Sequence, residues 1–183
     1  MSVKEIGSVL RSTSHTEYIV QILNPRKNLS IADYSLGSFV FLGKDIVAIV
    51  YDTEIFNPNA LSLSEQKLEF EKFAPDLLEE IDILLKVLIL GKFDINNMNQ
   101  SIPTEIIEAG ERVSLMTKEQ IKAFHLTSNN KLQLKYLTNL KEYKLAYTIF
   151  ENIYKQLQNL LDSKHLEILK LLQKNMLWER VYK

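Results

Sequence analysis

The sequence predicts an α+β protein: a small N-terminal β-barrel with an acidic insertion, followed by a C-terminal α-helical hairpin. Two observations favour this class. Over residues 3–52, Val, Ile, Tyr and Phe are dense in short runs separated by turn residues, which is typical of strands. Beyond residue 117 the apolar residues instead recur every three or four positions, the period of an amphipathic helix. We therefore predict a barrel-like domain over 1–116 and a helical domain over 117–183.

Turn signals divide the first part into strands. Asn24-Pro25 begins a loop, and Gly43-Lys44-Asp45 is predicted to form a hairpin turn. The run 45–52 is almost continuously apolar, so this strand is predicted to be buried on both faces.

Residues 60–80 are polar and acidic and are predicted to form an insertion between strands. Ser64 is suited to cap a short helix, which Pro75 would end. Carboxylates crowd this segment, and we interpret them as solvated surface or as a docking patch for a basic partner. These acidic residues are Glu69, Glu71, Asp76, Glu79 and Glu80, together with Asp82 just after the segment.

Residues 81–93 are predicted to return to strand. A helix is the alternative, because Leu and Lys favour it and the run is short. Strand is preferred since Gly91 closes the run and the irregular polar stretch 96–101 follows. A turn and a final short strand are predicted within 109–115.

The helical part begins with a capping box, Thr117-Lys118-Glu119-Gln120, which predicts a short helix ending near Phe124 or His125. Residues 132–137 are predicted to be extended. The longest helix is predicted over 138–162. Asp162-Ser163-Lys164 interrupts the pattern, and a second helix over 166–178 completes the predicted hairpin.

Aromatic and basic residues combine on the long predicted helix. Its aromatic positions are spaced 4-3-4, which is typical of a core stripe, but tyrosine keeps a polar tip near water and suits a half-exposed interface. Whether this helix is core or interface stays open at this point. The candidate interaction residues are Tyr143, Tyr147, Phe150, Tyr154, Lys141, Lys144 and Lys155.

Charge divides the chain as its periodicity does. The net charge is −1, but residues 117–183 hold 12 Lys/Arg against 6 Asp/Glu, and residues 1–116 hold 10 against 17. A basic segment can bind polyanions such as nucleic acid. The alternative is that these charges only solvate the helices, because they are interleaved with apolar residues.

Several chemistries are not expected. The absence of cysteine excludes disulfides, zinc–thiolate sites and thiol nucleophiles. His15, His125 and His165 do not stand at ligand spacing, and no Gly-x-Ser-x-Gly elbow occurs. We expect no catalytic residues, cofactor or metal.

The start of the chain lacks the apolar core of a signal peptide, and no run reaches the ~20 residues that span a bilayer. A cytoplasmic protein without membrane contact is therefore expected.

The order of the segments resembles the small barrel at the front of HerA-type DNA translocases and rotary ATP-synthase subunits. Ile6-Gly7-Ser8-Val9 followed by Ser12-Thr13-Ser14 is similar to the start of such barrels. The stretches 34–40 and 102–113 look like the family's later strands with their Gly and Pro turns, and 117–124 like the short helix after them. The resemblance covers about residues 3–116.

In that family the barrel is a collar and assembly element, and a P-loop ATPase follows it. Here no Gly-rich phosphate loop follows: Gly43-Lys44 precedes Asp45, and Gly91-Lys92 precedes Phe93. The resemblance therefore implies a non-enzymatic binding or assembly module, an accessory of a ring-shaped ATPase or DNA-processing complex. A protein partner such as a ring ATPase or nuclease is expected, and self-association is compatible with it. The alternative is a nucleic-acid-binding protein that uses its basic helical region.

Overall fold

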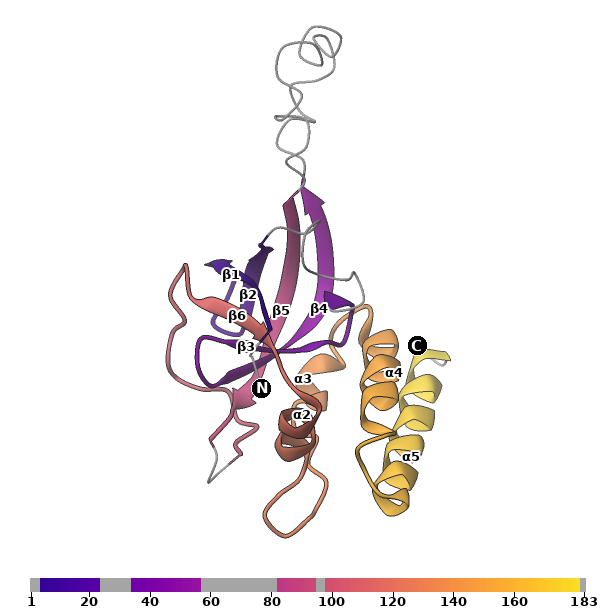
Figure 1. Cartoon of the computed structure of the whole chain (residues 1–183). Helices are drawn as coiled ribbons and strands as arrows, with labels where there is room; N and C mark the ends of the chain where they lie inside the picture. Colours follow the sequence, from indigo (N-terminus) through magenta and orange to yellow (C-terminus); the bar gives the residue numbers. More distant parts are fainter. Residues whose placement is uncertain (1–3, 24–33, 57–81, 95–97, 182–183) are drawn as a thin grey trace, which may run out of the picture.

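Backbone pairing closes a β-barrel within the described part of the chain (Figure 1). The structure is a computed structural model and describes residues 4–23, 34–56, 82–94 and 98–181. The strands are β1 (Glu5–Ser12), β2 (Glu17–Ile22), β3 (Phe39–Leu42), β4 (Ile46–Phe56), β5 (Asp82–Lys92) and β6 (Arg112–Leu115). Neighbours are antiparallel in the order β1-β2-β5-β4-β3-β6, and β6 closes the barrel by pairing with β1 and β3. The predicted α+β class with a barrel is confirmed.

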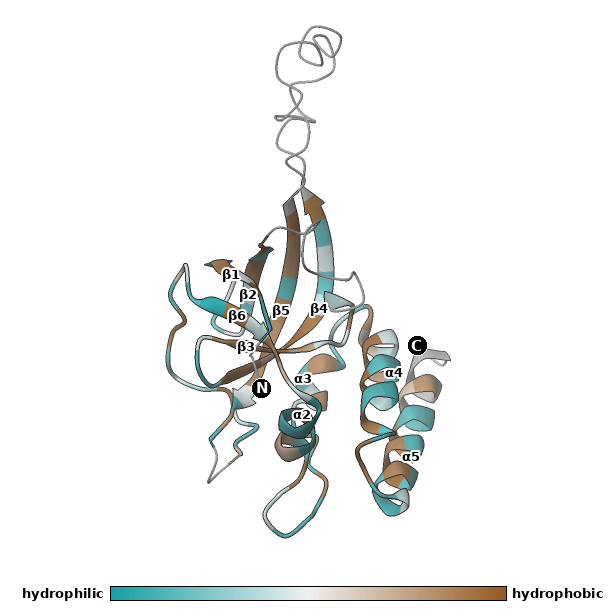
Figure 2. Cartoon of the chain, viewed as in Figure 1, coloured by the Kyte–Doolittle hydropathy of each residue, from teal (hydrophilic) through white to brown (hydrophobic). Residues whose placement is uncertain are grey.

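Within the predicted range 81–93, the described residues Asp82–Lys92 form a strand and not a helix, as predicted. β5 pairs with β2 along one edge and with β4 along the other, so its backbone hydrogen bonds are made in the sheet. β4 and β5 are the longest strands and project beyond the others in Figure 1. In Figure 2 the part of β4 nearest the helices is hydrophobic, whereas hydrophilic bands mark the projecting part.

Side-chain alternation gives the barrel two different walls. On β3 and β4, Val40 and Ala48 point into the barrel interior, whereas Phe39 and Ile49 point outward and pack under the helices. The same division holds on β5. We call the outer face of β3, β4 and β5 the covered wall. The outer face of β1 and β6 is the open wall, where Leu10 and Arg112 are exposed. The prediction that 45–52 is buried on both faces is confirmed for Ile46 to Val50.

The helices are α2 (Lys118–His125), α3 (Leu137–Leu140), α4 (Ala146–Leu157) and α5 (Ser163–Val181). The predicted capping box of α2 is confirmed: Gln120 N donates to Thr117 Oγ1, and Thr117 N donates to Gln120 Oε1. Helix α2 ends at His125, also as predicted. The expected extended segment 132–137 is found only at its start, where Leu132 forms a bridge with Leu126, because residues 135 and 136 form a turn and Leu137 already belongs to α3.

The single long helix predicted over 138–162 is wrong. Helix α3 ends at Leu140, residues 141–145 form turns, and α4 starts only at Ala146. The turns make short-range bonds, from Tyr143 N to Leu140 O and from Ala146 N to Tyr143 O. This break directs the Tyr143 side chain to the barrel, where its hydroxyl donates to Glu17. A tertiary contact thus outweighs helical periodicity.

One apolar cluster joins the barrel to the helices. It combines the covered wall with residues of α2, α3, α4 and α5, including Phe124, Leu140, Phe150 and Leu169. Helices α4 and α5 lie side by side in Figure 1. The predicted division at 116/117 stays a prediction. The predicted acidic insertion 60–80, with Ser64 and Pro75, lies outside the described residues.

Candidate functional site

The aromatic residues of the candidate interaction site do not share one environment. Phe150 is completely buried in the cluster between α4 and the covered wall. Tyr147 and Tyr154 are half-buried and pack against the same cluster from α4. Tyr143 precedes the helix, so the four aromatics do not form one continuous stripe. Of the four aromatic residues, Phe150 is thus buried, whereas the three tyrosines each reach solvent in part.

Tyr143 ties the helical part to the barrel wall through a carboxylate. Its hydroxyl donates to Glu17 Oε1 at the start of β2, and its ring lies 4.6 Å from that of Tyr51 on β4. Burial, followed by the negative charge of Glu17, raises the pKa of Tyr51 to about 12. Burial and the bond to Glu17 also raise the pKa of Tyr143. Both phenols therefore keep their protons at neutral pH and can donate hydrogen bonds. We interpret the contact between Tyr143 and Glu17 as one that holds the helical part against the barrel.

The basic residues of the candidate site are all on the surface. Lys141, Lys144 and Lys155 are exposed, and so are the other lysines described between residues 117 and 181. Lys155 lies on α4 at the edge of a pocket. The structure thus places the basic residues outward while it packs the aromatic ones inward.

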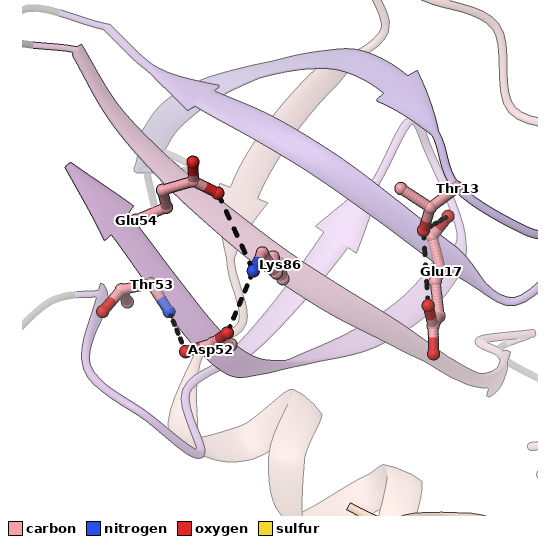
Figure 3. A network of polar contacts seen from close by, with 6 residues as sticks. All are labelled: Thr13, Glu17, Asp52, Thr53, Glu54 and Lys86. Atoms are coloured by element: carbon pink, nitrogen blue, oxygen red, sulfur yellow. Dashed lines mark hydrogen bonds and ion pairs between the residues drawn. The ribbon is translucent and has the colours of Figure 1, made fainter. Parts of the chain in front are cut away.

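The projecting part of β4 and β5 carries its own charge cluster. Figure 3 shows Lys86 Nζ between the carboxylates of Asp52 and Glu54, at 3.1 and 3.7 Å. The hydrogen bond to Asp52 is the main cause that raises the pKa of Lys86. Nearby, Thr13 Oγ1 lies 3.3 Å from a Glu17 carboxylate oxygen. The charge of Lys86 offsets only one of the two carboxylate charges, and such half-exposed ion pairs are typical of a solvated strand surface.

His125 is a completely buried core residue at the end of α2. Its Nδ1 lies 2.7 Å from Ile121 O and its Nε2 lies 2.8 Å from Tyr136 Oη. A carbonyl only accepts, so Nδ1 carries the proton and Nε2 accepts from the tyrosine. Burial lowers the pKa of His125 to about 4, although the bond to Ile121 opposes the shift. The ring is neutral and serves as a hydrogen-bonded core group.

The other histidines bind backbone carbonyls. His15 Nε2 lies 2.8 Å from Pro103 O, and His165 Nε2 lies 3.0 Å from Asn130 O. His165 Nδ1 lies 2.9 Å from Asp162 Oδ1, and these two atoms form an ion pair only when the imidazole is protonated. Within the described ranges, no three His, Asp or Glu side chains gather at metal-binding distance.

A pocket of about 350 Å³ opens where three segments meet. It is bounded by the approach to β3, by the junction of β6 and α2, and by α4. Its lining residues are Ser35, Ser38, Phe39, Leu115, Met116, Ile121, Asn152, Lys155 and Gln156. Of the candidate interaction residues only Lys155 belongs to it. The sequence signal for the other lining residues was weak: Asn152 and Gln156 stand four apart on α4 and share one side of it, but other polar residues occur on the same helix.

Helix α5 exposes apolar side chains on the side away from the cluster. Leu169 and Met176 are buried, whereas Ile168 and Leu171 are 41% and 61% exposed. Positions 168 and 171 are one turn apart and lie on the same side of the helix. This exposed pair was not recognised from the sequence, because an apolar residue on a helix indicates burial before it indicates a contact surface.

The fold and these surfaces define a small closed barrel with a helical layer on one wall. A family model described as "Domain of unknown function (DUF8166)" matches residues 2–183, and the chain belongs to that family. No curated protein matches the chain. Among the described residues, no helix has the length and apolar character needed to cross a bilayer.

Proposed function

We propose that this protein is a non-enzymatic module that binds a protein partner through its helical layer. The observation that carries the proposal is the exposed apolar pair Ile168 and Leu171 on a helix whose opposite face completes the core. Exposed apolar residues rimmed by charge are typical of contact surfaces. The exposed residues Lys164 and Lys174 flank this pair on α5, one turn before Ile168 and one turn after Leu171. The barrel interior is occupied by side chains such as Val20, Val50 and Val87, so the outer surface is what remains for binding.

We further propose that the partner belongs to a ring-shaped ATPase or DNA-processing complex in the cytoplasm. Support comes from the resemblance to HerA-type barrels together with the closed barrel itself. Where that family continues into an ATPase, this chain continues into α2 to α5. We take α4 and α5 to be a helical hairpin that stands in place of the ATPase domain and carries the binding function. The segment 60–80 is taken to be an acidic insertion.

Co-elution with a purified HerA-type ATPase from the same organism tests this function. Light scattering of the protein alone first gives its own oligomeric state. We expect the mixture to elute as one larger species, and the double variant Ile168→Asp/Leu171→Asp to elute separately. Leu10→Asp on the open wall is the matched control, because Leu10 is 43% exposed and lies on the other side of the barrel. Separate elution of the unaltered protein contradicts the proposal.

Nucleic-acid binding is the second candidate, favoured by the exposure of every described lysine in the helical part. Phosphate contacts release counterions, so the affinity for a labelled single strand would fall steeply with salt. The triple variant Lys141→Glu/Lys144→Glu/Lys155→Glu would weaken binding and reduce that salt dependence. Absence of binding at low salt eliminates this candidate and leaves the protein-binding function untouched.

A further inference from the structure

The pocket beside α4 has a rigid frame. Gly37 has φ +84, and a Cβ atom there would lie 3.0 Å from Asn152 Cβ and 3.1 Å from Ile149 O. The segment before β3 therefore rests directly on α4. Two side-chain bonds hold it there: Asn152 Nδ2 donates to Leu36 O at 2.9 Å, and Gln156 Nε2 donates to Gly37 O at 2.7 Å. A pocket fixed in this way exists before any ligand arrives, which lowers the entropic cost of binding.

Apolar side chains form the floor of the pocket. Phe39, Met116 and Ile121 are each buried, and they belong to the same cluster that joins the barrel to the helices. Leu115 completes this surface from β6. A floor of this kind excludes water from a small apolar group and offers it no polar or charged side chain. It is suited to one aliphatic side chain of a partner.

The rim offers both acceptors and donors. Because the amide nitrogens of Asn152 and Gln156 are used in holding the frame, their carbonyl oxygens are left as acceptors, and no bond to either oxygen occurs within the described part. Ser38 adds a hydroxyl group to this rim, 3.5 Å from the hydroxyl of Ser35, a distance typical of a weak contact. Acceptors and donors side by side match the N–H and C=O groups of a peptide backbone, which carries both.

The pocket carries one charge, and it is unbalanced. The Lys155 ammonium makes no hydrogen bond or ion pair in the described structure, and the lining residues include no carboxylate. A bound segment with a carboxylate beside its apolar side chain would complement this charge. Inorganic phosphate would leave the apolar floor unused, and a basic segment would be repelled by Lys155.

We propose that this pocket binds an acidic peptide segment of the partner. An aliphatic side chain enters over Phe39, Met116 and Ile121, an adjacent Asp or Glu pairs with Lys155, and backbone N–H groups donate to the amide oxygens of Asn152 and Gln156. This inference rests on the proposed function, because it states the chemistry of the partner that the helical layer recognises.

The test is an NMR titration of the full-length, ¹⁵N-labelled chain with the peptide acetyl-Glu-Leu-Glu-amide. We expect saturable shifts at Ser38, Met116, Ile121 and Gln156. Replacing both carboxylates (acetyl-Gln-Leu-Gln-amide) or the apolar side chain (acetyl-Glu-Ala-Glu-amide) should weaken binding. Lys155→Glu should lower the affinity by about five- to tenfold, as expected for reversal of one exposed charge. Lys44→Glu, an exposed lysine in the β3–β4 turn, should leave the affinity unchanged.

Three results overturn this proposal: no saturable shift at the lining residues at millimolar peptide, shifts confined to other surfaces, or equal affinity in Lys155→Glu and Lys44→Glu. The two proposals fail separately. If the ATPase co-elutes with Lys155→Glu as it does with the unaltered protein, the pocket proposal fails and the assembly function stands. If the peptide binds as expected but no ATPase co-elutes, the pocket stands and the ring-ATPase assignment fails.

Discussion

The covered wall and the open wall of this barrel use the same strand alternation but turn different residues outward. Phe39, Ile49 and Leu88 point outward on the covered wall and are buried by the helices. On the open wall, Leu10 and Arg112 point outward and remain exposed. Removing the helices would expose the covered wall to water, and this exposure costs a free energy of roughly 25 cal/mol for each Å² of apolar surface. The helical layer is therefore part of the barrel's own core.

The largest expected difference between the walls is in stability. Phe150→Ala empties a completely buried position between α4 and the covered wall, and should lower the free energy of unfolding by about 3–5 kcal/mol. Leu10→Ala on the open wall should cost less than about 1 kcal/mol because Leu10 is already largely hydrated. Urea unfolding of both variants measures the difference. Similar losses at the two sites would mean that the walls are not distinct.

The buried histidine under the covered wall should make stability depend on pH. The pKa of His125 is about 4 in the folded protein against an ordinary 6.5, so between these values the unfolded chain binds more protons. The stabilisation is complete above pH 6.5 and is lost as pH falls toward 4, by about 3 kcal/mol in all.

The measurement for His125 is urea unfolding from pH 7.5 to 4.5 for the unaltered protein and for His125→Gln. Carboxylates titrate in both proteins, so the difference between the two curves isolates the histidine. We expect the unaltered protein to lose more stability on acidification than the variant. Parallel curves would show that His125 is not held neutral in the fold.

Substitution of two glycines that both have positive φ separates the cost of close packing from the cost of backbone strain. Gly37→Ala introduces a methyl group against α4, whereas Gly110→Ala, near the start of β6, meets no atom within 4 Å. Both variants carry the strain of a non-glycine residue at positive φ, of order 1 kcal/mol, and Gly37→Ala should cost about 1–2 kcal/mol more. Thermal unfolding gives the comparison. Equal costs would contradict the close contact that frames the pocket.

The smallest expected effect is at the contact between Tyr143 and Glu17. Tyr143→Phe removes one half-buried hydrogen bond and keeps the ring against Tyr51, so a loss of about 0.5–1.5 kcal/mol is expected. Tyr154→Phe serves as the control, because no hydrogen bond of that hydroxyl occurs in the described structure. If both variants match the unaltered protein in urea unfolding, this bond does not fasten the turn at 141–145.

The sequence was sufficient where local chemistry decides the structure. The capping box at Thr117, the turn at Gly43 and the strand that contains Gly91 all depend on neighbouring residues, and each lies where it was predicted. The sequence was insufficient where contacts between residues far apart in the chain decide the structure. The break before α4 depends on a contact between Tyr143 and Glu17, 126 residues apart, which periodicity does not encode.

The pocket could not be predicted for the same reason. Ser38, Met116 and Gln156 come from three separate segments, and only the closed barrel brings them together. The lysines of the candidate site were predictable as surface residues, because a charged side chain is seldom buried without a partner. The role of the aromatic positions was not predictable, since Phe150 and Tyr154 occupy similar helical positions but differ in burial.

Native-state hydrogen exchange tests most directly the claim that the barrel and helices share one core. We expect the amides of Val47 and Ile49 on β4 and those of Ile149 and Ile153 on α4 to exchange through the same global opening. They would then share one free energy and one denaturant dependence. Exchange of α4 at a clearly lower free energy, while β4 stays protected, would contradict the account and show that residues 117–183 unfold as a separate domain.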